Sequence, residues 1–491
     1  MLRLFLLIIF FLFCSGLCAQ HNIIPQPLSF EGNNEVFLLD ETVGFKSSLN
    51  NSESNSFLKR QLGTITGYSF RNETSNRNIK LVLLPQDTLR SNEAYFLSVK
   101  KDSIVIRALS EKGFAYGIQS LLILYDKSKN AFSGCEIFDE PQYAYRAMHL
   151  DVCRHFFGKE VVKQYIGLLA ALKMNTLHLH LTDDQGWRIE IKKYPRLTEV
   201  GAWRTEKDGS RYGGFFSQQD LKELVAFAAQ RQVNIIPEIE IPGHSSAAIA
   251  AYPFLSCHGR QIVVPNTWGI KQDIYCPTDS TIQFLKDVLD EVCEIFPSPY
   301  IHIGGDEAPK AQWRKSGFVQ NLKREKGLKN FESVQHYFMN EIEKHLAAKG
   351  RRAIAWGEVI KGGVSKDMIV MSWLSKAAGN AAMKKGNAAI MAPRFFCYFD
   401  YPQSSKEKLH AIWMTQLPLK KVYGFSPAGR NFLPENKPLL LGGEATVWTE
   451  FITNEKQLLH QVMPRLAAMS EALWSKEKNY EDFLSRIDSL K

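Results

Sequence analysis

The sequence predicts an α/β protein in which a (β/α)8 TIM barrel is preceded by a small α+β domain. Two observations lead to this fold. From residue 143 onward, apolar strand-like runs alternate with helical stretches, as in a parallel β/α array. Eight such runs can be counted, which is the number that closes a TIM barrel. TIM-barrel active sites are built where the strands end, so the residues that follow each run are the candidates for a site. An open doubly wound sheet is the alternative, but no GxGxxG follows the first strand, as its nucleotide-binding versions require.

Residues 1–19, MLRLFLLIIFFLFCSGLCA, are predicted to be a secretory signal peptide cleaved after Ala19. One Arg precedes a long apolar core with small residues at its end. An uncleaved membrane anchor and a lipid-modified Cys are the alternatives. The bulky Leu17 and Phe13 before Cys18 and Cys14 disfavour lipidation. Since no other long apolar run follows, we expect an exported mature chain without a membrane span, in the periplasm or outside the cell.

Residues 20–142 are predicted to form the small N-terminal α+β domain. The runs KLVLLP, YFLSVK and SIVIRAL have strand character, and EKGFAYGIQSLLILY carries apolar residues at helical spacing. No cluster of chemically reactive side chains stands out in this region, so we expect it to act as a scaffold.

Residues 143–491 are predicted to form the barrel domain. Its helices include KEVVKQYIGLLAALK, SQQDLKELVAFAAQRQ and STIQFLKDVLDEVCEIF. The eight predicted strands are YRAMHLDV, MNTLHLHLTDD, VNIIPEIEIPGH, YIHIGGDE, RAIAWGE, DMIVMSWL, NAAIMAP and KPLLLGGEATVW.

Charge and cysteine usage limit the possible partners. The formal net charge of +9 is spread along the chain without a dense basic block, so nucleic-acid binding is not predicted. The Cys and His residues show no metal-ligand spacing, and neither a metal nor another cofactor is expected. Cys257 and Cys276 bracket a segment without strong periodicity, which favours a disulfide-closed loop in an oxidising compartment over two buried thiols. Cys135, Cys153, Cys293 and Cys397 are expected to be mostly buried and free.

The ends of the predicted strands carry side chains suited to sugars. A pyranose ring stacks its C–H faces on Trp and offers hydroxyls to charged hydrogen-bonding groups. A single acid or Trp at a strand end is more often a helix cap or a packing residue, but here every strand end contributes. In strand order they carry Asp151, Arg154 and His155; Asp183, Asp184 and Trp187; Glu238, Glu240 and His244; Asp306 and Glu307; Trp356 and Glu358; Trp373; Arg394, Tyr398 and Asp400; and Glu444, Trp448 and Glu450.

Several of these segments resemble family 20 glycoside hydrolases, the β-N-acetylhexosaminidases. The matching stretches are LDVCRHF, LHLTDDQGWRIEI, PEIEIPGH, HIGGDE, WGE, MSWL and GGEATVWTE, and the likeness continues through PRLAAMSEALWS. HIGGDE, DDQGWR and PGH together are a specific signal. The resemblance covers nearly all of the mature chain.

The resemblance explains why Asp306 and Glu307 are adjacent. A retaining glycosidase with a carboxylate nucleophile places its two acids about 5 Å apart on opposite sides of the bond, which neighbouring residues cannot easily do. In this family the 2-acetamido oxygen of the substrate is the nucleophile. The resemblance therefore implies that Glu307 is the general acid and then the base, while Asp306 orients the acetamido group and stabilises the oxazolinium intermediate.

The resemblance also implies roles for the other strand-end residues. Asp183 and His244 would tune Glu307, and Arg154 would bind hydroxyls of the terminal sugar. Trp356, Trp373 and Trp448 would wall the acetamido pocket, and Tyr398 would donate to the acetamido oxygen. Asp400 and Glu450 would bind the distal hydroxyls. Tyr398 and Asp400 lie in FFCYFDYPQ, where the match to the family is looser.

The implied function is exo-acting, retaining hydrolysis of terminal β-linked GlcNAc or GalNAc, with an oligosaccharide or glycoconjugate as substrate. Two alternatives remain open at this point. One is a relative that releases a disaccharide, such as a lacto-N-biosidase. The other is a catalytically inactive sugar-binding barrel, which has no need of the intact set Asp183, His244, Asp306 and Glu307.

Overall fold

The computed structural model describes residues 21–49, 52–70, 75–86, 88–429 and 432–488. The predicted signal peptide, residues 1–19, lies outside the described residues. The chain folds into two compact units. The first contains Pro27–Asp139 and the residues up to Ile23, and the second contains Ile24–Gln26 and Glu140–Lys491.

The first unit is built on a seven-stranded mixed sheet with the order β1-β7-β4-β5-β3-β2, in which β6 also pairs with β7. The predicted strands are present as β3, β4 and β5, and the predicted helix is α2. Strand β1 has a mostly exposed, polar sequence, so no apolar alternation marked it. The bounds are β1 (Ser29–Leu38), β2 (Gly44–Ser47), α1 (Glu53–Thr66), β3 (Asn78–Leu83), β4 (Tyr95–Lys100), β5 (Ser103–Ala108), α2 (Glu111–Ile123), β6 (Tyr125–Asp126) and β7 (Ala131–Asp139).

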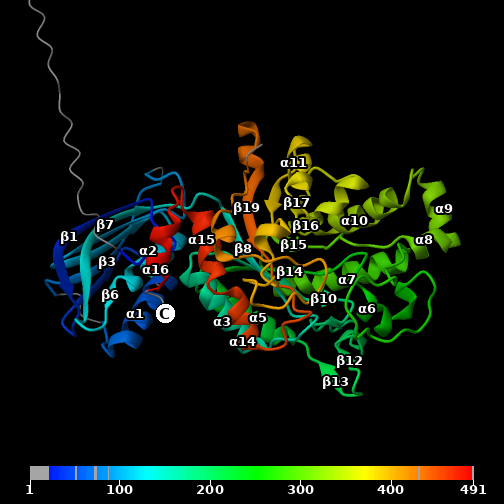
Figure 1. Cartoon of the computed structure of the whole chain (residues 1–491), viewed down its shortest axis with the longest axis horizontal. Helices are drawn as coiled ribbons and strands as arrows, with labels where there is room; N and C mark the ends of the chain where they lie inside the picture. The colour runs from blue at the N-terminus through cyan, green and yellow to red at the C-terminus, as the bar shows by residue number, and fades with distance from the viewer. Residues whose placement is uncertain (1–20, 50–51, 71–74, 87, 430–431, 489–491) are drawn as a thin grey trace, which may run out of the picture. The chain divides into compact units, whose positions relative to one another are not determined.

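The second unit is a closed barrel of eight parallel strands, which confirms the predicted fold class (Figure 1). Each of the eight predicted segments supplies one strand, and going round the barrel the strands follow chain order. They are β8 (Tyr145–Asp151), β9 (Thr176–His180), β14 (Asn234–Glu238), β15 (Tyr300–His302), β16 (Arg352–Trp356), β17 (Ile369–Ser372), β18 (Ala389–Met391) and β19 (Leu440–Ala445).

Helices and short strands connect the barrel strands. Helix α7 begins after Thr278, whose side chain accepts a hydrogen bond from the Thr281 backbone N–H, a typical N-cap. The helices are α3 (Lys159–Ala171), α4 (Arg196–Glu199), α5 (Gln218–Ala229), α6 (Ser246–Ala251), α7 (Asp279–Ile295), α8 (Ala311–Lys315), α9 (Gly317–Glu325), α10 (Phe331–Ala348), α11 (Ala377–Lys384), α12 (Arg394–Cys397), α13 (Leu419–Tyr423), α14 (Glu455–Val462), α15 (Arg465–Trp474) and α16 (Tyr480–Asp488). Short strands β10 (Thr182–Asp183) and β11 (Gly186–Trp187), and β12 (Trp203–Thr205) and β13 (Arg211–Gly213), form two hairpins; η1 (Pro253–Leu255), η2 (Gly357–Lys361) and η3 (Pro434–Leu439) are 3-10 turns.

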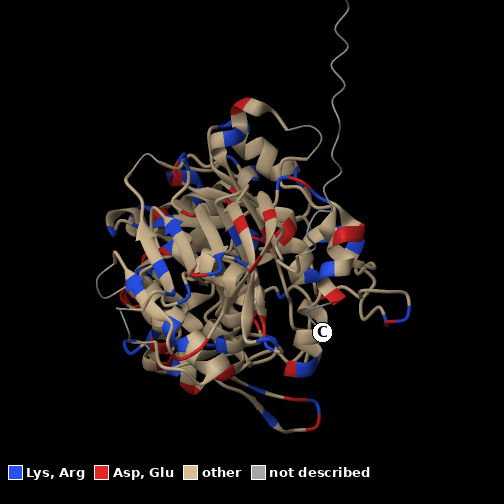
Figure 2. Ribbon diagram, turned by 90° about the vertical axis from the view of Figure 1, so that its left-hand side faces the viewer, with Lys and Arg blue, Asp and Glu red and all other residues tan. Residues whose placement is uncertain are grey.

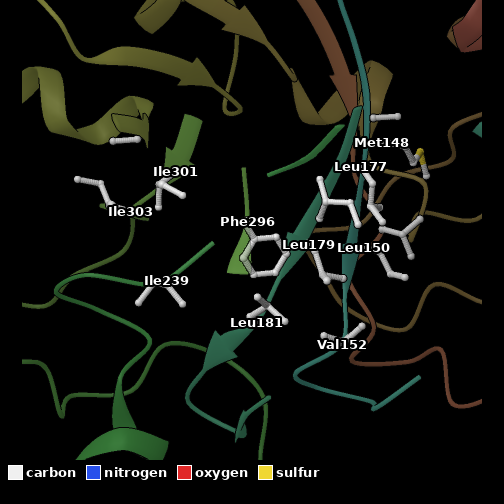
Figure 3. Close-up of a cluster of buried hydrophobic side chains, with 14 of the residues drawn as sticks. Met148, Leu150, Val152, Leu177, Leu179, Leu181, Ile239, Phe296, Ile301 and Ile303 are labelled. Carbon is white, nitrogen blue, oxygen red and sulfur yellow. The ribbon is translucent and has the colours of Figure 1, made fainter. Parts of the chain in front are cut away.

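Side chains alternate between the two faces of the barrel strands. Met148, Leu150, Leu177 and Leu179 belong to a large apolar cluster shared with the surrounding helices (Figure 3). The residues between them, such as His149 and His178, therefore face the barrel interior. There the strand register brings His149 beside His178, Asp151 beside His180, and Glu238 beside both His180 and His302. An apolar outer face thus lets the inner face carry polar groups.

Other sequence predictions concern cysteines, charge and the membrane. Cys257 and Cys276 are joined by a disulfide. Cys135, Cys153 and Cys397 are buried and free, and Cys293 is free and half-buried, as expected. Lys/Arg and Asp/Glu positions are both spread along the ribbon (Figure 2). In the described part of the chain, no helix is both long and apolar enough to cross a bilayer.

Candidate active site

A cavity of about 440 Å³ lies among the strand ends of the barrel. It collects every catalytic and sugar-binding residue predicted from the sequence except Trp356. Its lining is Arg154, Asp183, Glu240, His244, Gly269, Ile270, Asp306, Glu307, Trp373, Arg394, Tyr398, Asp400, Tyr401, Trp413, Met414, Trp448 and Glu450.

The adjacent acids Asp306 and Glu307 occupy different environments because of the turn after β15. Gly304 and Gly305 have φ of +64° and +108°, and a Cβ on Gly304 would lie 1.8 Å from an oxygen of Glu240. Glu307 also has a positive φ of 42°, which is strained for a residue with a side chain. The result is that the Asp306 side chain is 11% exposed, whereas the Glu307 side chain is 35% exposed. One acid faces inward and the other reaches the open part of the cavity.

Asp306 is a buried carboxyl with an available acceptor. Within the described part of the chain, its Oδ1 atom has no hydrogen-bond partner. Burial, together with the nearby carboxylates Glu358 and Glu307, raises the pKa of Asp306 to about 8, against the opposing effect of His244. A buried acceptor without a partner is costly, so this oxygen is suited to receive an N–H donor from a ligand.

His244 connects the two acids to Asp183. Its Nδ1 atom lies 3.2 Å from Oδ1 of Asp183, and its Nε2 atom lies 3.6 Å from Oε2 of Glu307 and 3.8 Å from Oδ2 of Asp306. Burial alone would lower the pKa of His244, but the Asp183 carboxylate raises it well above its usual value. Asp183 in turn has a pKa well below its usual range, because Arg154 and His244 outweigh the effect of burial.

Arg154 is held by several acids at the side of the cavity. Its guanidinium lies 2.9 Å from Asp183 and 3.1 Å from Asp151, and 3.9 Å from Glu450. Its Nε–H also donates to Gln185 at 3.2 Å. Although the side chain is only 9% exposed, it lines the cavity, so it has the fixed geometry needed to bind two hydroxyls.

Aromatic rings form another part of the cavity wall, and the Arg154 guanidinium lies over the Trp448 ring at 5.0 Å from its centroid. Trp373 and Tyr398 stack with centroids 6.0 Å apart, and Tyr398 lies 6.3 Å from Trp448. The Trp373 indole N–H donates to Glu358 at 2.8 Å. Trp356 differs from the prediction: it is 1% exposed, donates to Glu238 at 2.8 Å, and is absent from the cavity lining. As the last residue of β16 it points into the barrel interior, one layer below the wall.

Asp400 and Glu450 place two further carboxyls at the cavity. The pKa of Asp400 is raised well above its usual value by burial and by Glu450. Burial also raises the pKa of Glu450, although Arg154 opposes this. Both are oxygen acceptors placed for hydroxyl groups.

Several lining residues had no role predicted from the sequence. Glu240 and Arg394 were noted only as strand-end residues. Trp413 and Met414 come from the long segment between β18 and β19, and Gly269 and Ile270 from the loop closed by the Cys257–Cys276 disulfide. Neither segment has a periodic pattern that predicts a helix or strand. For the loop that carries Gly269 and Ile270, the pair Cys257 and Cys276 was the one feature of the sequence that indicated a fixed position.

The described residues contain four buried groups whose His, Cys, Asp or Glu ligand atoms lie within 4.8 Å of one another. In the group nearest the cavity, Asp183 and His244 already hydrogen-bond to each other, and Asp184 accepts from Ser246. The groups are His149, His178 and Glu238; Asp151, Cys153 and His180; His180, Glu238 and Glu240; and Asp183, Asp184 and His244.

Family models match both parts of the chain. Residues 143–477 match the glycosyl hydrolase family 20 catalytic domain, and residues 20–140 match domain 2 of that family. The chain belongs to glycosyl hydrolase family 20. As a family 20 member it is a glycoside hydrolase, and the cavity at the barrel strand ends occupies the place of a TIM-barrel active site.

Relatives support this family 20 assignment over most of the chain. A beta-hexosaminidase from Porphyromonas gingivalis is 40% identical over 81% of this chain and 53% of its own length, so the chain spans about half of that relative. A beta-hexosaminidase from Vibrio furnissii is 35% identical over 92% of this chain and 76% of its own length.

Solved family 20 structures have the same fold. The exo beta-N-acetylglucosaminidase from Vibrio harveyi, in complex with N-acetylglucosamine, has a TM-score of 0.86 at 33% identity, covering 95% of this chain and 76% of that one. The beta-N-acetylhexosaminidase from Bacteroides fragilis has a TM-score of 0.85 at 31% identity, covering 95% and 94%.

Proposed function

We propose that this chain is an exo-acting β-N-acetylhexosaminidase that hydrolyses terminal β-linked GlcNAc or GalNAc with retention of configuration. The substrate is an oligosaccharide or glycoconjugate that ends in an N-acetylhexosamine. The observation that carries the proposal is the division between the adjacent acids. Asp306 is buried with an oxygen that has no hydrogen-bond partner among the described residues, and Glu307 is half-exposed beside His244.

The proposed first step uses the acetamido oxygen of the substrate as the nucleophile. Asp306 accepts a hydrogen bond from the acetamido N–H. This contact turns the acetamido carbonyl oxygen toward the anomeric carbon. Glu307 donates a proton to the glycosidic oxygen as that bond breaks, which leaves an oxazolinium ion and the free aglycone. In its ionised form, Asp306 stabilises the positive charge that develops on the ring. Such preorganised electrostatic stabilisation is typically the largest catalytic contribution.

The second step returns the enzyme to its starting state. Glu307, now a carboxylate, takes a proton from water as the water oxygen attacks the anomeric carbon. The oxazolinium ring opens to the acetamide, and the product keeps the β configuration. His244 and Asp183 keep Glu307 in position through both steps. Trp373, Tyr398 and Trp448 enclose the acetamido group, while Arg154, Asp400 and Glu450 bind hydroxyls.

The test is the dependence of rate on the acetamido group. With p-nitrophenyl N-acetylglucosaminide and its mono-, di- and trifluoroacetyl analogues, kcat should fall stepwise, because fluorine withdraws electron density from the attacking oxygen. The plain β-glucoside should be almost inert. A rate that is indifferent to fluorination, or a trapped sugar ester on any Asp or Glu, would show that the protein supplies the nucleophile. A parallel assay with the lacto-N-biose glycoside decides between monosaccharide and disaccharide release.

We also propose that the protein is exported to the periplasm or the cell exterior. The support is the apolar stretch of residues 1–19 with its small-residue end, and the disulfide between Cys257 and Cys276, since disulfides persist in oxidising compartments. Fractionation of cells, followed by mass-spectrometric determination of the N-terminus, tests this. A cytoplasmic protein that retains Met1 would exclude it.

A further inference from the structure

Resting on the proposed function, we propose that His180 is a positioning residue: it fixes Asp183 from inside the barrel, so that Asp183 keeps His244 directed at Glu307. His180 ends strand β9 and is fully buried. It is not among the residues that line the cavity. Its effect on the reaction therefore has to pass through Asp183.

The two nitrogens of His180 contact two carboxylates. Nε2 lies 2.8 Å from Oδ2 of Asp183, and Nδ1 hydrogen-bonds to Glu238. Both contacts are N–H donations only if the ring is protonated on both nitrogens. Burial opposes that charge, but Glu238 and Asp183 raise the pKa of His180 to about 9.

Glu238 is a fixed anchor for this chain of contacts. Its other oxygen lies 2.7 Å from Nδ1 of His302 and accepts from the Trp356 indole N–H at 2.8 Å. The contacting residues come from β9, β15 and β16, while Glu238 itself ends β14. Four adjacent strands of a closed barrel thus fix Glu238. Glu238 is the first residue in the series of contacts Glu238–His180–Asp183–His244–Glu307.

Asp183 has a second partner that also faces the cavity. Its Oδ2 atom is shared between His180 and Arg154, which lies 2.9 Å away, while Oδ1 faces His244. Arg154 lines the cavity and is proposed to bind sugar hydroxyls as well, so this partner of Asp183 also contacts the substrate. His180 is not among the cavity-lining residues, so its contact with Asp183 is made away from the sugar. His180 therefore keeps Asp183 oriented while a sugar is bound.

The surroundings of His180 contain further polar and charged groups. Asp151 and Cys153 form one close group with it, and Glu238 and Glu240 form another. The His180 backbone carbonyl accepts from the Cys153 thiol at 3.2 Å. The ring also packs against His149 and Trp448, with centroids 5.5 Å and 5.1 Å away.

Two substitutions separate positioning from packing. The amide nitrogen of Gln takes the place of ring Nε2, and that of Asn takes the place of ring Nδ1. His180→Gln therefore keeps a donor toward Asp183, whereas His180→Asn keeps a donor toward Glu238 alone. Both replace an imidazole in the same buried site by a smaller amide, so they are matched in chemistry, and the thermal midpoint of each is measured alongside its kinetics.

The readout is kcat and KM with one activated and one poor leaving group. For the substrate with the poor leaving group, His180→Asn should lower kcat about 100-fold. A displacement of about 1 Å in the residues that position the catalytic acid can lower the rate by that factor. The loss from His180→Asn should be smaller on the activated substrate, and KM should change little. His180→Gln should stay within about tenfold of the wild type on both substrates. Equal losses in the two variants, or wild-type kinetics in both, would overturn the proposal.

A measurement that needs no variant keeps the inference testable if either protein fails to fold. In a crystal structure of the wild type with a thiazoline analogue of the intermediate, the His180–Asp183 contact should remain below about 3.2 Å. A His180–Asp183 contact that is broken while His244 still faces Glu307 would overturn the role. Failure of the proposed function is distinguishable, since then the wild type itself would not hydrolyse N-acetylglucosaminides.

Discussion

The Nε2 atom of His244 lies 3.6 Å from Oε2 of Glu307. Through this contact the half-exposed acid at the cavity is linked to a line of buried, alternating imidazoles and carboxylates. Catalytic hydrogen bonds are often long before a ligand binds and tighten in the complex. The separation is therefore compatible with a direct hydrogen bond once the sugar is present.

Glu307→Gln should remove the general acid. We expect kcat to fall by about 10²–10⁴-fold, the usual contribution of general acid–base catalysis. The loss should be smaller for a dinitrophenyl glycoside than for chitobiose, because a good leaving group needs little protonation. Glu325→Gln, an exposed position on α9, is the matched control and should behave as the wild type. Equal losses on both substrates would contradict the acid role.

Asp306→Asn should change how stability depends on pH. The pKa of Asp306 is about 8 in the folded chain, through burial first and neighbouring carboxylates second, against about 4 when unfolded. The folded state therefore binds an extra proton between these values, and the stability this gives is lost as pH rises through 8.

Asn does not ionise, so the stability of the variant relative to that of the wild type should increase between pH 5 and pH 9. The pKa difference corresponds to about 4 kcal/mol of stability lost between these two pH values. We expect a change of about 4–8 °C in the difference between their thermal midpoints, since 1 kcal/mol corresponds to about 1–2 °C in a domain larger than 250 residues. Differential scanning calorimetry at the two pH values measures it. An identical difference at both would mean that Asp306 is ionised throughout. The variant should also be slower, because the charge facing the oxazolinium is lost.

Arg154→Lys should weaken sugar binding and also disturb Asp183. A guanidinium reaches Asp151, Asp183 and Gln185 at once, and a single ammonium cannot reproduce that fork. We expect KM to rise about tenfold and kcat to fall with it, because Asp183, which is 1% exposed, loses its 2.9 Å contact with the fixed guanidinium. Arg324→Lys on α9 serves as the control. Unchanged constants in a folded variant would remove Arg154 from the site.

Removing the disulfide should affect both stability and binding. Cys257→Ala/Cys276→Ala opens the loop that carries Gly269 and Ile270 into the cavity lining. We expect a loss of about 2–4 kcal/mol in unfolding free energy, the typical value for a disulfide, and a higher KM. Cys293→Ala, which removes a free half-buried thiol, is the control. If KM is unchanged while stability falls, Ile270 makes no contribution to substrate binding.

Much of the fold could be predicted because each barrel strand is buried on its outer face. Leu177 and Leu179 are apolar for that reason, and runs of this kind mark strands in any sequence. Strand β1 was missed because its exposed, polar residues carry no such signal. The inward-facing residues of the same barrel strands, such as His178 and His180, were visible in the sequence but were not interpreted, since their partners lie on other strands.

Patterns within short segments were enough to predict the fold class, the family resemblance and the identity of most cavity residues. What each residue contacts could be learned only from the folded chain. Asp306 and Glu307 are neighbours in the chain, yet the positive φ angles of Gly304, Gly305 and Glu307 send one acid inward and the other outward. The fold also places Trp356 beneath the wall and brings Trp413 to it. Burial and charge neighbourhood are set by segments far apart in the chain, and so they follow only from the closed barrel.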